Sequence, residues 1–209
     1  MWEIVTAGGW LMLPIVACSI VALAIVGERF YTLRAGRVLP TNLVADVWRM
    51  ASTRQLTEKK VREIEKGSPL GRVLAAGLHN RTQDRDVMKA SIEDVGGHVS
   101  HELGRYLNAL GTIAAVTPLL GLLGTVVGMI GVFTNITTVG VGNPAQLAGG
   151  ISQALVTTAG GLTVAIPSLM FHRYFRGKVD SLVVDMEKES LKLVDVLQKR
   201  PPKVRVARP

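Results

Sequence analysis

Residues 106–172 read YLNALGTIAAVTPLLGLLGTVVGMIGVFTNITTVGVGNPAQLAGGISQALVTTAGGLTVAIPSLMFH, and no Asp, Glu, Lys or Arg interrupts these 67 residues. The rest of the 209-residue chain is well charged, with 24 Lys and Arg and 16 Asp and Glu. A soluble core needs no uncharged run of this length, whereas about 20 apolar residues cross the hydrocarbon of a membrane as one helix. The run is broken near its middle by TTVGVGNP. It therefore predicts two transmembrane helices, 106–136 and 145–172, joined by a turn at 137–144.

A third uncharged stretch, residues 4–27, predicts another transmembrane helix at 10–33, preceded by a short segment at 1–9. Its first basic residue, Arg29, follows the apolar run, whereas a cleaved signal peptide carries positive charge before the run. We therefore expect a retained helix, and an all-α integral membrane protein with three transmembrane helices. The 106–136 helix would be roughly 46 Å long at about 1.5 Å per residue, against a hydrocarbon core of roughly 30 Å. It should therefore project into the cytoplasm.

The placement of the basic residues predicts the orientation. Thirteen Lys and Arg lie in 34–105, ten lie in 173–209, and none lies in the long uncharged run. Basic segments stay on the cytoplasmic side of a membrane. We therefore expect a cytoplasmic helical domain at 34–105 and a cytoplasmic C-terminal helix at 173–198, with 1–9 and the turn on the other side of the membrane. Because the net charge of +8 lies on segments that flank the membrane, it argues against nucleic-acid binding.

Helical patterns occupy both charged segments. Ser68 followed by Pro69 predicts a helix start, with serine as the N-cap and proline at the first helical position. Two apolar stripes at helical spacing follow. The first leads into the 106–136 helix and comprises Val87, Ser91, Val95, Val99 and Leu103. The second lies on the 173–198 helix and comprises Val179, Leu182, Val183, Met186, Val194 and Leu197. Residues 199–209 predict a basic disordered tail, which either binds anionic lipid headgroups or stays solvated.

Small and polar residues cluster on one face of each long membrane helix. At about 100° per residue they cover an arc of roughly 120° on the 106–136 helix and roughly 160° on the 145–172 helix. The predicted packing glycines are Gly121, Gly124, Gly128, Gly131, Gly150, Gly160 and Gly161. The polar residues beside them are Thr125, Gln153, Thr157 and Thr158. Glycine faces let helices pack closely in lipid, and the polar side chains favour a further role in lining a central path within a ring of subunits.

Four other residues of the membrane helices have expected roles. Pro118 and Pro167 lie within the two long helices, where proline removes an intrahelical hydrogen bond and is expected to kink the helix. Glu28 and Arg29 lie at the cytoplasmic end of the first helix. We expect them at the membrane edge, anchored among the lipid headgroups.

The two long helices lack an acid, and Glu28 and His172 lie only at helix ends. Proton relays within membranes normally use a carboxylate or a histidine. If the protein works with a proton gradient, the proton carrier must therefore come from a partner, or water and threonine hydroxyls must form the path. His98 and His101 have no third ligand nearby in the sequence, and Walker A, GxSxG and HExxH motifs are missing. We expect no enzyme site, no metal and no cofactor.

Three motifs resemble the ExbB/TolQ/MotA proton-channel family. TPLLGLLGTVVGMI at 117–130 resembles its second-helix signature, GISQALVTTAGGLTVAIP at 150–167 resembles its third-helix signature, and residues 19–30 resemble the end of its first helix. Three helices resemble the ExbB and TolQ branches, whereas the MotA branch has four. The sequence of the third helix and the short 1–9 segment favour an ExbB-like subunit. A TolQ-like subunit of the Tol-Pal envelope-maintenance motor is the alternative.

The resemblance implies a homopentameric ring around an ExbD- or TolR-like subunit, which supplies a membrane aspartate. Such a complex uses proton-motive force to do work on a TonB- or TolA-like protein, in biopolymer transport or in envelope maintenance. The resemblance also makes Thr125 and Thr158 the family's pore threonines, whose hydroxyls bond the partner's aspartate or order water beside it. Gln153 is a departure, because several relatives carry glutamate there and a neutral amide cannot titrate.

Two hypotheses from other functional classes differ in what they predict. A passive scaffold would stabilise partner helices without conducting protons, so valine at position 125 or 158 would be nearly silent. A self-sufficient channel would conduct without a partner. The lack of charge within the membrane helices and of an internal inverted repeat disfavours the second of these.

Overall fold

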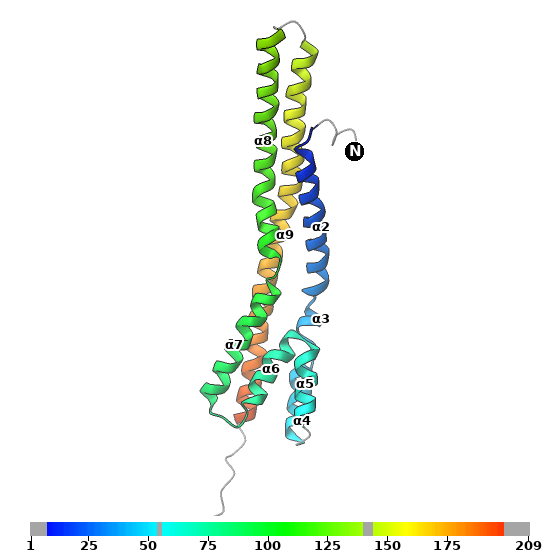
Figure 1. The fold of residues 1–209 in the computed structure, drawn as a ribbon. Coiled ribbons are helices and arrows are strands. Elements are labelled where there is room, and N and C mark those ends of the chain that lie inside the picture. Colours follow the sequence, from blue (N-terminus) through cyan, green and yellow to red (C-terminus); the bar gives the residue numbers. More distant parts are fainter. Residues whose placement is uncertain (1–7, 54–55, 140–143, 199–209) are drawn as a thin grey trace, which may run out of the picture. The chain divides into compact units, whose positions relative to one another are not determined.

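The computed structural model describes residues 8–53, 56–139 and 144–198, and every regular element among them is an α-helix (Figure 1). The helices are α2 (Met12–Thr32), α3 (Ala35–Val38), α4 (Leu43–Ser52), α5 (Glu58–Gly67), α6 (Pro69–His79), α7 (Arg85–Leu103), α8 (Leu107–Val139) and α9 (Pro144–Gln198). The chain divides into two compact units. The apolar unit comprises Met1–Arg29 and Tyr106–Arg176, and the charged unit comprises Phe30–Arg105 and Gly177–Pro209.

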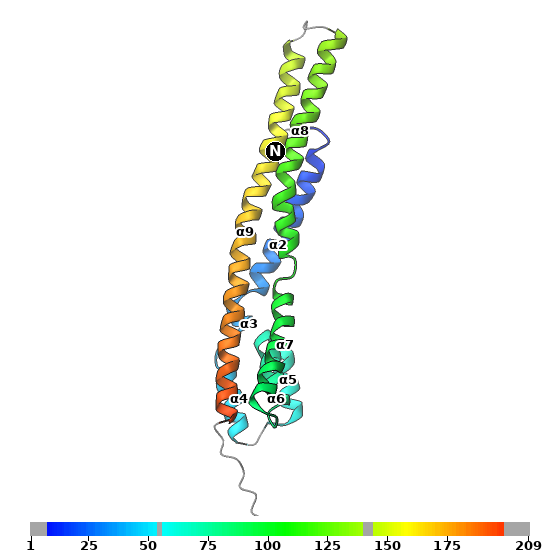
Figure 2. The ribbon, with the colours of Figure 1, turned by 90° about the vertical axis from the view of Figure 1, so that its left-hand side faces the viewer.

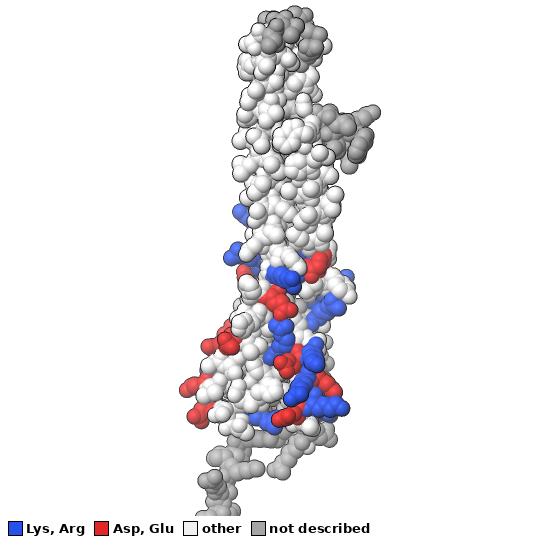
Figure 3. Space-filling model, viewed as in Figure 1, with Lys and Arg blue, Asp and Glu red and all other residues white. Residues whose placement is uncertain are grey.

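Three helices among the described residues, α2, α8 and α9, are long and apolar enough to cross a membrane. Within the apolar unit, α8 and α9 lie side by side in both ribbon views (Figures 1 and 2). Large apolar side chains point outward from all three helices, including Leu23, Leu119 and Ile166. On the face drawn in Figure 3, charged side chains gather over the charged unit and are missing along most of the apolar unit. Lipid is the solvent that suits such a surface, so the chain is a multi-pass membrane protein.

The bounds of α2 and α8 lie within three residues of those expected from the sequence. The third expected helix, 145–172, is part of the longer α9, which continues without a break through the expected 173–198 helix to Gln198. Residues 1–7, the turn residues 140–143 and the tail 199–209 lie outside the described residues, so the predictions made for them stay predictions.

The core of the charged unit is built around α6, which packs against α5 and α7. Leu70, Leu74 and Leu78 recur at four-residue spacing and are almost completely buried. The predicted start of this helix is confirmed, because the Ser68 hydroxyl accepts a hydrogen bond from the Gly71 amide at 3.0 Å. Burial of one α6 face against two neighbouring helices therefore holds this unit together.

The apolar stripe predicted on α7 is only partly correct. Val99 and Leu103 are buried as expected, but Val87 is 47% exposed, and Met88 and Ile92 are buried in its place. Each four-residue step advances about 400°, or roughly 40° beyond a full turn, so a stripe at strict four-residue spacing drifts around the helix. The observed buried set follows the helical period instead.

The first stripe does not lead into α8 as one continuous helix. Helix α7 ends at Leu103, and α8 begins at Leu107 after a break at residues 104–106. Tyr106 lies in the left-handed region with φ of 63°, and its carbonyl accepts the first α8 hydrogen bond, from the Leu110 amide at 3.0 Å. A left-handed residue interrupts a right-handed helix, which is why α8 starts here.

The apolar stripe predicted on the C-terminal part of α9 is confirmed at four of its six positions, and Val183 and Leu197 are half-buried. Val179, Leu182, Met186 and Val194 are buried in the charged unit. Leu193, which was not part of the predicted stripe, is buried with them. Helix α9 thus presents an apolar stripe to the helices of the charged unit while its membrane segment belongs to the apolar unit.

Candidate functional site

The candidate site is the seam between α8 and α9, where glycines bring the two backbones together. A Cβ atom added to Gly161 would lie 2.8 Å from the carbonyl oxygen of Thr117 and 3.2 Å from the Cα of Gly121. A Cβ added to Gly121 would lie 3.1 Å from the Cα of Thr158. One at Gly128 would lie 3.0 Å from the Cβ of Ala154. Larger residues at these positions would push the helices apart.

Three other predicted packing glycines lie against side chains. Gly124 faces the Thr157 side chain, and Gly150 faces Val132. Gly160 faces α2 instead, because a Cβ there would lie 3.1 Å from the Cε of Met12. Gly131 differs from all of these, since no described atom lies within 4 Å of a Cβ built on it.

The two threonines that the resemblance assigns to the pore lie around one backbone carbonyl. The Thr158 hydroxyl on α9 donates to the Gly121 carbonyl on α8 at 2.9 Å. The same carbonyl is the helical partner of the Thr125 amide, because an α-helical amide bonds the carbonyl four residues earlier. The Thr125 hydroxyl donates to the Leu122 carbonyl at 2.7 Å. Both hydroxyl protons are therefore committed to backbone carbonyls, and the remaining capacity of each oxygen is to accept.

Thr157, expected beside the path, is instead turned into the apolar unit. Its side chain is 1% exposed, and its hydroxyl lies 2.8 Å from the carbonyls of both Gly8 and Gln153. Gly9 follows with φ of 73°, a conformation that favours glycine. A Cβ atom at Gly9 would overlap the side-chain amide nitrogen of Gln153, so this position has no room for a side chain. Within this chain, the Thr157 hydroxyl therefore links α9 to the segment that comes before α2.

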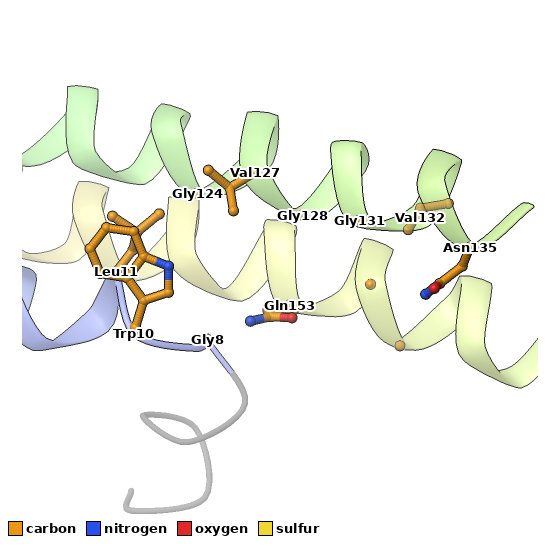
Figure 4. A pocket seen from close by; sticks show the side chains of 12 residues that line it. Gly8, Trp10, Leu11, Gly124, Val127, Gly128, Gly131, Val132, Asn135 and Gln153 are labelled. Atoms are coloured by element: carbon orange, nitrogen blue, oxygen red, sulfur yellow. The ribbon is translucent and has the colours of Figure 1, made fainter. Parts of the chain in front are cut away.

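An open groove of about 430 Å³ lies between α8, α9 and this segment. In Figure 4, the Gln153 amide lies beside Gly8, with Trp10 and Leu11 toward one end of the groove and Asn135 toward the other. The Gln153 side chain is exposed. Polar groups at this depth require a polar partner or water, so the Gln153 and Asn135 side chains make this groove a place for either.

The two predicted membrane-edge residues pair with each other. Arg29 is 3% exposed, and its guanidinium Nε and Nη2 donate to the carboxylate of Glu28, the latter at 2.7 Å. The guanidinium carbon also lies 5.5 Å from the centre of the Tyr106 ring. The position at the end of α2 is the expected one, but Arg29 is packed inside the chain, whereas a headgroup anchor would be exposed.

The remaining sequence candidates are two prolines and two histidines. Pro118 and Pro167 lie inside α8 and α9, which remain continuous helices through both residues. Neighbouring hydroxyls bond nearby carbonyls, as Thr117 does with Ile113 at 2.5 Å and Ser168 does with Val164 at 2.7 Å. His98 and His101 are both exposed on α7.

Sequence reasoning missed two features of this site. The contact of Gly8 and Gly9 with Thr157 and Gln153 joins residues about 145 positions apart, and the sequence signal for it was only a glycine pair before Trp10. The second feature is His172, treated above as a helix-end residue. Its ring packs against Gly111 of α8, where an added Cβ would lie 3.0 Å from Nε2.

Comparison with known proteins agrees with this architecture. The model of the family described as "MotA/TolQ/ExbB proton channel family" matches residues 65–188, which is more than half of the chain. The "Putative biopolymer transport protein ExbB-like 1" of Synechocystis is 34% identical over 169 residues, covering 79% of this chain and 66% of the relative. This chain therefore spans just under two thirds of that protein's length.

Two further relatives represent the ExbB and TolQ branches. "Biopolymer transport protein exbB1" of Vibrio cholerae is 29% identical, with 77% of this chain and 72% of the relative covered. "Tol-Pal system protein TolQ" of Pseudomonas aeruginosa is 25% identical, with 88% of this chain and 86% of the relative covered. The glycine and threonine seam lies inside the matched region, and the chain belongs to the MotA/TolQ/ExbB proton channel family.

Proposed function

We propose that this chain is an ExbB-like channel and stator subunit of a motor driven by proton-motive force in a bacterial inner membrane. Five copies form a ring around an ExbD-like subunit, and the complex energises a TonB-like protein for outer-membrane transport. The segment before α2 and the α8–α9 turn face the periplasm, and the charged unit faces the cytoplasm. Family membership and the placement of basic residues support this proposal.

One observation carries the proposal. Helix α8 contains no titratable side chain, yet Thr125 and Thr158 lie around the Gly121 carbonyl where the backbones of two membrane helices come close together. Threonine hydroxyls cannot store a proton, so the carrier must be a carboxylate supplied by a partner or a chain of water. A small subunit with one membrane aspartate supplies what these helices lack.

The hydroxyl hydrogen bonds of Thr125 and Thr158 decide which groups the two threonines can bind. A threonine oxygen has one donor and two acceptor lone pairs. Because Thr125 and Thr158 each donate to a carbonyl, they offer acceptors to an incoming group. They therefore favour a protonated carboxyl of the partner, or a water that donates to them. Gln153, which cannot titrate, orders water or the partner's backbone and does not carry protons in this proposal.

Proton flux in vesicles tests the proposal. The full chain is reconstituted alone, then with the small acidic subunit, using wild-type and Asp→Asn forms of that subunit. We expect flux only with the intact partner. Flux from this chain alone would contradict a partner-borne carrier.

Substitutions at the two threonines separate conduction from scaffolding. We expect Thr125→Val and Thr158→Val to lower flux by roughly 5- to 150-fold, the equivalent of losing a polar contact worth about 1–3 kcal/mol. Thr163→Val is the matched control, because that hydroxyl also bonds a carbonyl of its own helix, at 2.7 Å, and is exposed. Normal assembly and normal flux in the first two variants would favour the passive scaffold.

The second candidate is a TolQ-like subunit, favoured by the length of the match to the Pseudomonas protein. Complementation separates the two branches. An ExbB-like chain would restore TonB-dependent uptake in a strain lacking its own ExbB, whereas a TolQ-like chain would restore detergent resistance in a strain lacking TolQ.

A further inference from the structure

We propose that His172 is a proton relay at the charged end of the α8–α9 seam, passing protons between water within the seam and water beyond it. This inference rests on the proton conduction proposed above and adds a protonatable group of the chain's own to the path. The observations that carry it are a buried ring nitrogen, its position on α9 and the charges around it.

The His172 ring is held against α8 by a glycine. A Cβ atom built on Gly111 would lie 3.0 Å from Nε2 and 3.2 Å from Cδ2 of the imidazole, so this position admits the ring because it lacks a side chain. The Nδ1 atom is buried and has no hydrogen-bond partner among the described residues. A buried polar atom left unpaired costs about 1–3 kcal/mol, so this nitrogen is placed to bond a water or an incoming group.

His172 shares a face of α9 with the polar residues of the candidate site. At about 100° per residue it falls roughly 40° from Thr158 and roughly 60° from Thr157, which places it between them around the helix axis. Ser168, which is also buried, falls on the same face. Along the axis, His172 lies about 21 Å from Thr158, at about 1.5 Å per residue. The face of α9 that carries Thr157 and Thr158 thus also carries the His172 imidazole.

The surrounding charges suit a group that passes protons on. Helix α8, against which the ring packs, has no titratable residue between Leu107 and Val139. On α2, Glu28 and Arg29 pair with each other. On α9 itself, Arg173 and Arg176 are exposed. Helix α8 therefore presents no carboxylate to the imidazole.

The relay step balances without another reagent. A water in the seam gives a proton to the Nδ1 lone pair, and the neutral imidazole becomes an imidazolium. The imidazolium then gives one N–H proton to a water beyond the seam and becomes neutral again. One proton enters and one leaves, and only N–H and O–H bonds form or break.

The test measures flux against pH in vesicles holding this chain and its acidic partner. His172→Gln keeps a polar side chain that cannot titrate, and His172→Phe keeps a ring of similar shape. We expect both to lower flux at least tenfold and to remove its dependence on pH between about 5 and 8, the range in which histidine switches. His101→Gln, at an exposed histidine of α7, is the matched control and should conduct normally. Wild-type flux with an unchanged pH profile in His172→Gln would overturn the relay.

A spectroscopic measurement tests the ring without relying on flux. In lipid, ¹⁵N signals of His172 in the full chain should shift with pH and show exchange with water at Nδ1. A ring that neither titrates nor exchanges would overturn the proposal, including in a preparation that does not conduct. Gly111→Ala, which crowds the ring, should alter these signals, whereas Gly131→Ala has open space and should not.

The outcomes distinguish this inference from the proposed function. If Asp→Asn in the partner and Thr125→Val abolish flux while His172→Gln does not, the relay fails and the partner-borne carrier stands. If flux is unaltered by all three of these substitutions, the proposed conduction fails as well. A helical melting profile like that of the wild type shows that a variant without flux is still folded.

Discussion

The apolar unit and the charged unit are both helical, yet their helices pack by different means. In the apolar unit, backbones meet at glycines, as at Gly161 and Gly121, and a hydroxyl of one helix bonds a carbonyl of the next. In the charged unit, large side chains such as Leu74 fill the space between helices. Exposed ion pairs join α6 to α7 and α7 to α9, with Arg72–Glu102 at 2.6 Å and Arg85–Asp195 at 2.5 Å.

The difference follows from the solvent. In water, burying a leucine removes apolar surface from contact with water and stabilises the fold. In lipid, a leucine is as well solvated outside the bundle as inside it, so close backbone approach and polar bonds between helices provide the attraction. The same amino-acid change should therefore have a different effect in each unit.

The largest contrast is expected for leucine truncation. Leu74 is 0% exposed in the charged unit, and Leu74→Ala should reduce the free energy of unfolding by about 2–5 kcal/mol through a cavity. Leu23 on α2 is 69% exposed, and Leu23→Ala should change the free energy of unfolding by less than about 0.5 kcal/mol. Denaturant titration in detergent, followed by helical circular dichroism, measures both. Equal losses would show that the burial of the leucine does not decide the cost of its truncation.

Adding one methyl group should have different effects at two glycines of the apolar unit. Gly161→Ala places a Cβ 2.8 Å from the Thr117 carbonyl oxygen and should destabilise the α8–α9 pair by about 1–3 kcal/mol. Gly131→Ala, on α8, meets open space and should be neutral or should stabilise by up to about 1 kcal/mol through helix propensity. The Tm values of the two variants in detergent give the comparison, and a stable Gly161→Ala variant would count against close packing.

Helix capping should matter in the charged unit by about 1 kcal/mol. Ser68→Ala removes the bond from the Gly71 amide and should lower stability by about 0.5–2 kcal/mol. Thr57 is the N-cap of α5 but makes no capping bond with its side chain, so Thr57→Ala is the matched control and should have a smaller effect. Urea titration of both variants measures the difference. Equal effects would indicate that residue type matters more than the observed bond.

The smallest effect is expected at Thr157. Thr157→Val removes the hydroxyl that bonds the Gly8 carbonyl, at a cost of about 0.6 kcal/mol, the average for such bonds between membrane helices. Thr157→Ser keeps the hydroxyl and is the control. Hydrogen exchange of the Gly8–Met12 amides should become faster in the valine variant only. Faster exchange in both would assign the effect to packing of the methyl group.

The sequence predicted the membrane helices well because lipid imposes a simple rule. Absence of charge marked α2 and α8 to within three residues. The rule failed where local backbone geometry decides the structure. No periodic pattern revealed that Tyr106 would adopt a left-handed conformation and separate α7 from α8. The α7 stripe was misplaced at Val87 because apolar residues at equal spacing do not keep to one side of a helix.

The residue types of the candidate site were predictable from the sequence, but their contacts were not. Glycines and threonines marked the seam, and the resemblance selected Thr125 and Thr158 among them. The sequence could not show that Thr157 bonds Gly8, or that Gly111 makes room for His172, because both contacts join residues far apart in the chain. A position's angle on its own helix says which residues share a face, and only the fold says what that face meets.

Tyr106 limits how this chain can change. A left-handed backbone costs a residue other than glycine roughly 1–2 kcal/mol, so Tyr106→Gly would relieve strain at φ of 63°. The same change would remove the ring that lies 5.5 Å from the Arg29 guanidinium carbon, a contact worth up to about 2 kcal/mol away from water. Position 106 therefore balances two opposing preferences of similar size. Exchanging the tyrosine for glycine would give up the contact with the guanidinium to relieve the backbone, and Arg29 would keep its pair with Glu28.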